Sequence, residues 1–203
     1  MNGEKNGKDK EYYDNNSLKM YCEYKNDKKF GKMKEYSKNQ ILLLEIEYLN
    51  GEKNGKVREY YENGQLKFEG EYLNNQKNGK IKEYYENGEL LLEGEYIKGE
   101  KNGKIYEYYE NGELLFEGEY IKGKKNGKTK EYNDKGDLEF EGEYKDGKRW
   151  NGKGIEYNIS WNLEFEGEYL NGKRWNGLII EYDWEDNEII FDGFVIEGEK
   201  VEK

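Results

Sequence analysis

A motif of about 24 residues repeats along the chain, and it constrains the fold more than any other feature. Asn-Gly-Lys recurs in steps of 24 residues from Asn54 to Asn126, and Asn-Gly then returns in steps of 25 residues at Asn151 and Asn176. With two degenerate copies, eight units begin near residues 6, 30, 54, 78, 102, 126, 151 and 176. Such a period is typical of arrays in which each unit packs only on its neighbours. We therefore expect one repeat array over residues 1–203, not the core of a globular enzyme.

Each unit has the signature of a β-hairpin. In the third unit, Asn63-Gly64 lies between two runs rich in β-formers, KVREYY and LKFEGEY. An Asn-Gly pair in this setting is a strong hairpin signal, because both residues tolerate the positive φ of a two-residue turn. Such a turn places Glu59 opposite Phe68, a carboxylate among apolar side chains. Either a bulge shifts the strand or Glu59 has a fixed polar partner.

A second Asn-Gly pair, as at Asn78-Gly79, is expected to close each unit onto the next. The predicted fold is all-β: an elongated, single-layer antiparallel sheet of about eight consecutive hairpins with a period of 24–25 residues. Residues 176–203 carry nine Asp or Glu and two Lys. We expect this segment to be an acidic capping unit, because an exposed sheet edge needs charge or cover against aggregation.

Two kinds of column recur within the units. A glycine occupies one mid-strand position, as at Gly70 and Gly94, which predicts the close approach of another group; an aromatic ring from the adjacent repeat is the natural candidate. Tyrosines recur at two further positions, where stacking at strand spacing would form ladders. We take these together as one candidate ladder face, made of Tyr60, Tyr84, Tyr108, Tyr132, Tyr72, Tyr96, Tyr120 and Tyr144.

The charge pattern excludes some functions. The net charge is −11 and no strongly basic stripe is present, so a nucleic-acid partner is not expected. The single cysteine, Cys22, rules out an intramolecular disulfide, and the N-terminus does not resemble a signal peptide. No run of residues is long and apolar enough for a transmembrane segment. An intracellular, cytoplasmic location is therefore the favoured expectation.

The sequence offers little for catalysis. The chain has no histidine, so neither a Ser-His nor a Cys-His pair can form, and there is no Cys or His cluster for zinc. The glutamates recur from unit to unit, whereas a catalytic pair is normally unique. Pairing with Lys or Arg across strands, for example Arg58 opposite Glu69, explains them better. We expect no enzyme activity, no cofactor, no metal site and no catalytic residue.

The tryptophans break the repetition, because all four lie late in the chain. Trp150 and Trp175 follow Arg149 and Arg174 in equivalent loops one repeat apart. Trp and Arg are enriched in interaction hot spots, so Arg149, Trp150, Arg174 and Trp175 are candidates for a partner-binding edge. The alternative is that each Trp packs on the loop of its neighbour.

The motifs EGEYxxGxxNGK and YxNGxLxxEGEY resemble the MORN repeat, and particularly its second variant, which occurs in YwqK-type antitoxin-like proteins. The resemblance covers essentially the whole chain and implies the single-layer hairpin fold. It also implies a non-catalytic scaffold that binds a protein partner, possibly in an antitoxin-like or immunity-like role. Two alternatives stay open: a membrane-associated module, which the net acidity disfavours, and a self-assembling structural protein.

Overall fold

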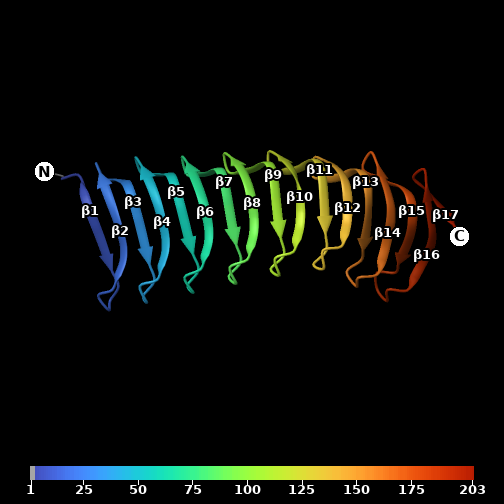
Figure 1. Cartoon of the computed structure of the whole chain (residues 1–203), viewed down its shortest axis with the longest axis horizontal. Helices are drawn as coiled ribbons and strands as arrows, with labels where there is room; N and C mark the ends of the chain where they lie inside the picture. Colours follow the sequence, from blue (N-terminus) through green and yellow to red (C-terminus); the bar gives the residue numbers. More distant parts are fainter. Residues whose placement is uncertain (1–2) are drawn as a thin grey trace. The chain divides into compact units, whose positions relative to one another are not determined.

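The computed structural model describes residues 3–203, which divide into two compact units, one ending at Gly112 and one beginning at Glu113. Unit 1 contains nine strands, and within it consecutive strands of the chain lie side by side (Figure 1). They are β1 (Gly7–Tyr12), β2 (Leu18–Lys25), β3 (Lys28–Tyr36), β4 (Leu42–Leu49), β5 (Glu52–Tyr60), β6 (Leu66–Leu73), β7 (Gln76–Tyr84), β8 (Leu90–Ile97) and β9 (Glu100–Tyr108).

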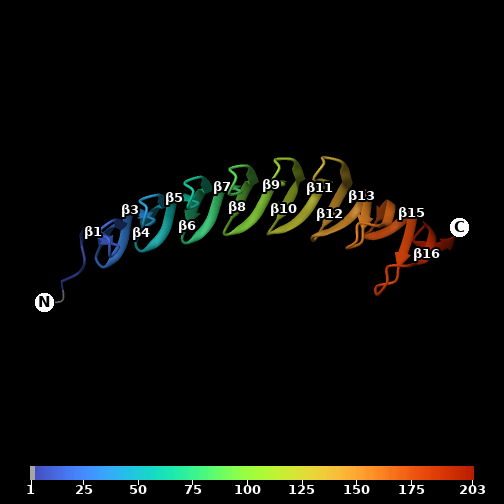
Figure 2. The same ribbon diagram turned by 90° about the horizontal axis from the view of Figure 1, so that it is seen from below.

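Unit 2 continues the same pattern with eight strands. They are β10 (Leu114–Ile121), β11 (Lys124–Tyr132), β12 (Leu138–Lys145), β13 (Lys148–Tyr157), β14 (Leu163–Leu170), β15 (Lys173–Tyr182), β16 (Ile189–Ile196) and β17 (Glu199–Glu202). Within each unit, consecutive strands are antiparallel and form one layer of curved hairpins (Figure 2). No helix occurs in residues 3–203. The predicted all-β array of hairpins is therefore confirmed.

The turn inside the third repeat is one residue longer than expected, and the turn between β15 and β16 is two residues longer. The Tyr61 amide donates to the Gln65 carbonyl and the Gly64 amide donates to the Tyr61 carbonyl, both at 2.9 Å. Only Gly64 has a positive φ, +86°, so Asn63 lies in the ordinary region. This is a three-residue loop built on a type I turn with a glycine in the left-handed region. The expectation of a two-residue turn with two positive φ angles was wrong.

The turn between repeats lies before the second Asn-Gly pair, not at it. Between β6 and β7, Asn74 and Asn75 both have positive φ, +50° and +66°, as a two-residue type I′ turn requires. Asn78-Gly79 lies inside β7, where the register against β6 shifts and Gly79 has φ +76°. The pair therefore makes a β-bulge, and our assignment of it to a turn was wrong.

The two faces of the sheet differ in chemistry. In the β5–β6 hairpin, Phe68 and Gly70 point to one face, which we call the aromatic face together with the equivalent side chains of the other strands. Glu69 and its cross-strand partner Arg58 point to the other, the charged face. The buried side chains follow the aromatic face, and in unit 2 they form one cluster: Phe140, Phe165, Tyr169, Ile179 and Val195.

The glycine column lies on the aromatic face, under side chains. A Cβ built on Gly70 would lie 2.9 Å from Ile81 in the next repeat and 3.2 Å from the Phe68 ring in its own strand. At Gly94 the covering atom is Cδ1 of Ile105, 2.2 Å from the built Cβ. Close approach is thus confirmed. The expected covering group was wrong, because the residue from the next repeat is aliphatic and the ring comes from the same strand.

Candidate functional site: the faces and turn edges of the sheet

Lysines stack between aromatic rings on the aromatic face. In unit 1, Lys77 Nζ lies 4.6 Å from the centroid of the Phe68 ring and 5.5 Å from that of Tyr96. Lys53 lies in the same way over Tyr72, at 5.3 Å. Each lysine therefore alternates with the tyrosines of the strands beside it, an arrangement that cation–π attraction stabilises. The tyrosines of this column do not stack directly on one another, because a cation lies between them.

The glutamates opposite the phenylalanines are held by these same lysines. Glu59 pairs with Phe68 within its hairpin, as predicted, and Glu83 of the next repeat faces Phe68 from the other side. The Glu83 carboxylate accepts a hydrogen bond from Lys77 Nζ at 2.5 Å. The side chain of Glu83 is 24% exposed and that of Lys77 is 31% exposed. Both of the alternatives left open are therefore present: a β-bulge shifts the register between Glu59 and Tyr60 but leaves Glu59 opposite Phe68, and in the next repeat a fixed polar partner accommodates the Glu83 carboxylate.

In β13 of unit 2, Arg149 takes the position that Lys125 has in β11. Its Nη2 donates to Glu131 at 2.8 Å, its Nη1 donates to the Ile155 carbonyl at 3.2 Å, and its guanidinium lies 4.7 Å from the Phe140 ring centroid. Its side chain is only 19% exposed. Arg174 repeats the arrangement with Glu156 and Phe165. Both predicted binding arginines are therefore engaged in ion pairs within the sheet.

The ionisation of this cluster follows from its burial and its ion pairs. Burial disfavours the charged form of Glu131, but Lys125 and Arg149 outweigh it and hold the pKa of the carboxyl below its usual value. Burial, and then the neighbouring Glu131 carboxylate, raises the pKa of the Tyr144 hydroxyl. In unit 1, burial and two glutamates raise the pKa of Tyr96 to about 12. These shifts repeat along the sheet and mark a structural network, not a single reactive group.

The two predicted tyrosine columns lie on opposite faces. The Tyr72 ring contacts Phe68 edge-on at 6.2 Å, on the aromatic face. The Tyr84 hydroxyl, by contrast, donates to Glu69 at 3.4 Å on the charged face. The two predicted columns therefore do not form one ladder face. The first column comprises Tyr60, Tyr84, Tyr108 and Tyr132, and the second comprises Tyr72, Tyr96, Tyr120 and Tyr144. The alternation of side chains along the strand already indicated this difference. Glu59 pairs with Phe68 on the aromatic face, so Tyr60, the next residue, points to the opposite face.

A third set of tyrosines links neighbouring hairpins, and the sequence analysis missed this role. The Tyr61 hydroxyl donates to the Tyr84 carbonyl at 2.7 Å, and the Tyr85 hydroxyl donates to the Tyr108 carbonyl at 2.8 Å. Each bond spans 23 residues and joins one repeat to the next. The adjacent Tyr-Tyr pair in the motif was the available signal, because only one of two neighbouring residues can point to the charged face.

Trp150 and Trp175 lie against the turns of the following hairpins. A Cβ built on Gly172 would lie 3.2 Å from the Trp150 ring, and the Gly172 amide donates to the Trp150 carbonyl at 2.9 Å. Lys145 Nζ lies 4.3 Å from the centroid of the same ring. Trp175 packs on Gly198 in the same way. Both tryptophans are partly buried, and these contacts favour the packing alternative over a projecting edge.

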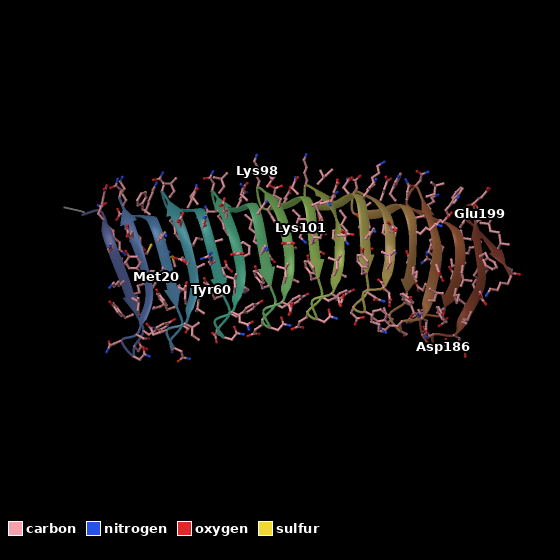
Figure 3. The ribbon with its side chains drawn as sticks, viewed as in Figure 1. Met20, Tyr60, Lys98, Lys101, Asp186 and Glu199 are labelled. Carbon is pink, nitrogen blue, oxygen red and sulfur yellow. The ribbon has the colours of Figure 1, made fainter. Side chains whose placement is uncertain are left out.

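The other two tryptophans are the exposed ones. Trp161 lies in the turn after β13 and is 78% exposed, and Trp184 lies in the turn after β15 and is 87% exposed. Figure 3 shows Asp186, from the second of these turns, at one edge of the sheet. The sequence analysis did not separate these residues from Trp150 and Trp175. The signal was their position inside the turn segments, where no neighbouring strand can cover them.

The charged face of unit 1 carries an open groove of about 750 Å³ that extends over several strands. One column of its lining is lysine (Lys32, Lys56, Lys80 and Lys104), and the column facing it is glutamate (Glu47, Glu71 and Glu95). The second pair of columns forms cross-strand ion pairs, with Lys82 3.4 Å from Glu93 and Arg58 3.8 Å from Glu69. The lining has six cationic and six anionic side chains, so the groove has no net charge.

Residues 3–203 contain no group of three Asp, Glu or Cys side chains placed to bind a metal ion. In the same residues, no helix has the length and apolar character needed to cross a membrane.

Comparison with known proteins gives a family match. A model described as the MORN repeat variant matches residues 5–26, 53–74, 77–98, 101–122 and 125–146. These five segments of 22 residues cover 110 of the 203 residues, more than half of the chain. A search of curated proteins gives no match.

Two solved structures are similar over most of this chain. One is titled "Crystal Structure of TcdB2-TccC3-TEV", with 11% identity, 94% of this chain covered and a TM-score of 0.22. The other is titled "Crystal Structure of TcdB2-TccC3 without hypervariable C-terminal region", with 12% identity, 93% covered and a TM-score of 0.23. The chain spans only 12% and 11% of the length of these two chains.

Proposed function

Because the chain belongs to the MORN repeat variant family, we propose that it is a non-catalytic scaffold that binds a protein partner. The observation that carries this proposal is the open, charge-balanced groove on the charged face of unit 1. Its columns present Lys and Glu at regular intervals of two strands, so its pattern suits a protein surface that bears both signs of charge. A specific form, by analogy with antitoxin-like relatives, is a scaffold that neutralises its partner.

The main alternative is a membrane-associated module. Anionic lipid recruits clusters of Lys and Arg, whereas each lysine column of this groove faces a glutamate column. The groove therefore offers no net attraction to a lipid surface. Self-assembly through the sheet ends is the other alternative, and like-charge repulsion between the acidic residues near β17 disfavours a contact between two C-terminal ends.

A charge swap tests the proposal without changing net charge. Lys80 lies opposite Glu95, and Lys56 lies opposite Glu71. Replacing Lys80→Glu with Glu95→Lys, and Lys56→Glu with Glu71→Lys, keeps each opposite-charge pair and inverts the pattern that a partner would read. Wild type and variant are immobilised, captured proteins are identified by mass spectrometry, and the Kd of each purified candidate is measured.

We expect the swapped variant to keep its melting temperature and to lose affinity for a specific captured protein by about tenfold or more. Equal affinity for every captured protein would remove the groove as the binding surface. Sedimentation of the wild type with anionic vesicles at physiological salt would instead favour the membrane alternative. The predicted edge, Arg149, Trp150, Arg174 and Trp175, is tested in the same assay with Trp150→Ala and Trp175→Ala. A large fall in melting temperature with unchanged affinity would assign these tryptophans to packing.

A further inference from the structure

Two neighbouring turns of unit 2 present large apolar side chains to solvent. Ile159 is fully exposed, Trp161 is 78% exposed and Trp184 is 87% exposed. Asn158 Nδ2 donates to Asn187 Oδ1 at 2.8 Å, and this bond holds the turn after β13 beside the turn after β15. We call Ile159, Trp161 and Trp184 the turn patch. Exposed apolar clusters of this kind mark interaction sites more often than isolated exposed residues do.

Trp161 occupies an unfavourable backbone position. Its φ is +62°, and its amide donates to the Asn158 carbonyl exactly where Gly64 donates to Tyr61 in unit 1. Four equivalent turns use glycine at this position, as at Gly88 and Gly136, and the first two turns use the smaller polar residues Asn16 and Gln40, so Trp161 is the one large aromatic residue at this position in the three-residue turns of residues 3–203. A side chain with a Cβ is disfavoured in the left-handed region, because the Cβ comes too close to a carbonyl oxygen.

No burial offsets this strain at Trp161. The ring contact described for its indole is a tilted one with Tyr157, at 6.3 Å between centroids, and Tyr157 is itself 42% exposed. A bulky residue that keeps a strained conformation while most of its side chain stays exposed is the kind of outlier that points to function.

The surroundings of the turn patch are acidic. No Lys or Arg occurs between Lys153 and Lys173, or between Arg174 and Lys200. The turn after β15 contains four carboxylates: Asp183, Glu185, Asp186 and Glu188. Two cations, Lys173 and Arg174, lie between the two segments, and Arg174 is paired with Glu156. The patch thus combines aromatic faces with a negative rim.

We propose that the turn patch binds a basic amphipathic segment of a protein partner. Apolar side chains of that segment would cover Ile159 and the two indoles, and its Lys or Arg would pair with the acidic rim or lie over the indole faces. A second copy of this chain fits poorly, because a symmetric contact would bring two acidic rims together. An anionic lipid surface is disfavoured for the same reason. This inference rests on the proposed scaffold function and names the chemistry of a partner at a surface separate from the groove.

The test uses two 18-residue helical probes with the same leucine face, one with lysine and one with glutamate on the polar face. Binding is measured by tryptophan fluorescence and calorimetry at physiological salt. The key variant is Trp161→Gly, which introduces the residue found at this position in four equivalent turns. We expect it to raise the melting temperature, since strain is relieved, and to weaken binding of the lysine probe at least about tenfold.

Charge variants supply the matched control. Neutralising the acidic rim with Glu185→Gln, Asp186→Asn and Glu188→Gln should strongly weaken binding of the lysine probe. The control variant neutralises three exposed carboxylates in the equivalent turns of unit 1, with Glu62→Gln, Glu86→Gln and Glu110→Gln. Its affinity for the lysine probe should stay within about twofold of the wild-type value, because those turns carry no tryptophan.

Several results would overturn the inference. These are equal binding of both probes, no binding of the lysine probe, unchanged affinity in Trp161→Gly, or equal effects of the two charge variants. Sedimentation that shows a wild-type dimer dissociated by Trp161→Gly would assign the patch to a second copy, and binding to anionic vesicles lost in the same variant would assign it to lipid. Failure here, combined with loss of partner affinity in the Lys80–Glu95 swap, would leave the scaffold function standing without this surface.

Discussion

Gly142→Ala provides a sharp test of how the sheet is packed. Gly142 lies on the aromatic face of β12, opposite Gly152 in β13. A Cβ built on it would lie 2.1 Å from the Asn151 carbonyl oxygen and 2.7 Å from the Gly152 Cα, both backbone atoms. Gly70 occupies the same position in unit 1, but its nearest atom is a side-chain carbon of Ile81, at 2.9 Å. The two glycines therefore form a matched pair that differs in what covers them.

The expected cost of Gly142→Ala follows from this geometry. Ordinary contact begins near 3.4 Å, so β13 would have to move by about 1.3 Å, which exceeds what a ladder hydrogen bond tolerates. Losing two ladder bonds at about 0.5–1.5 kcal/mol each, with about 1 kcal/mol of overpacking, gives roughly 3 kcal/mol. In Gly70→Ala the Ile81 side chain moves by a few tenths of an ångström. Alanine also restricts the unfolded chain by about 0.4–1 kcal/mol in both variants, which brings the net change near zero for Gly70→Ala and leaves roughly 2–2.6 kcal/mol for Gly142→Ala.

Thermal melting followed by far-ultraviolet circular dichroism measures both variants. At about 2–4 °C per kcal/mol for a chain of this size, we expect Gly142→Ala to melt roughly 4–10 °C below wild type and Gly70→Ala within about 2 °C of it. Equal shifts in the two variants would show that the identity of the covering atom does not matter. A stable Gly142→Ala protein would refute the close backbone approach between β12 and β13.

Three further predictions concern ionisation and modularity. The folded-state pKa of Tyr96, about 12, lies above the unfolded value near 10, so the contribution of Tyr96 to the free energy of unfolding is complete below pH 10 and is lost as the pH rises through 12. Absorbance titration should therefore show a late tyrosine step that coincides with unfolding, and early titration of all tyrosines would contradict this. The pKa of Glu131 is lowered, so the contribution of Glu131 to the free energy of unfolding is present above about pH 4.5 and is lost as the pH falls through the folded-state pKa. In urea unfolding, Glu131→Gln should therefore destabilise the protein more at pH 7 than at pH 3. Equal effects at the two pH values would exclude the ion pairs as the cause. Removing residues 76–99, one complete repeat, should leave a folded β protein with a modestly lower melting temperature, whereas loss of the β signal would count against nearest-neighbour packing.

The sequence alone determined the elements and their order. The repeat period and the glycine turn residues are local features, and the apolar alternation of LKFEGEY is local as well, so hairpins could be predicted without knowing what packs on them. The cross-strand pairing of Glu59 with Phe68 was also predictable, because turn position sets register. The same register implied that Tyr60 and Tyr72 occupy different faces, although the columns were first grouped together.

Only the tertiary structure decided which side chains are covered. Whether Trp150 projects or packs depends on where the Gly172 turn lies, and Gly172 is 22 residues away in the chain but adjacent in space. Trp161 and Trp150 are both tryptophans of the late repeats, and the sequence does not distinguish their exposure. Trp161 lies beyond the strand ends and is exposed, whereas Trp150 packs on the turn that contains Gly172. The bulge at Asn78-Gly79 likewise appears only in the pairing of β6 with β7. Exposure and register shifts arise from contacts between repeats, and a pattern within one repeat does not encode which atoms its neighbour brings to it.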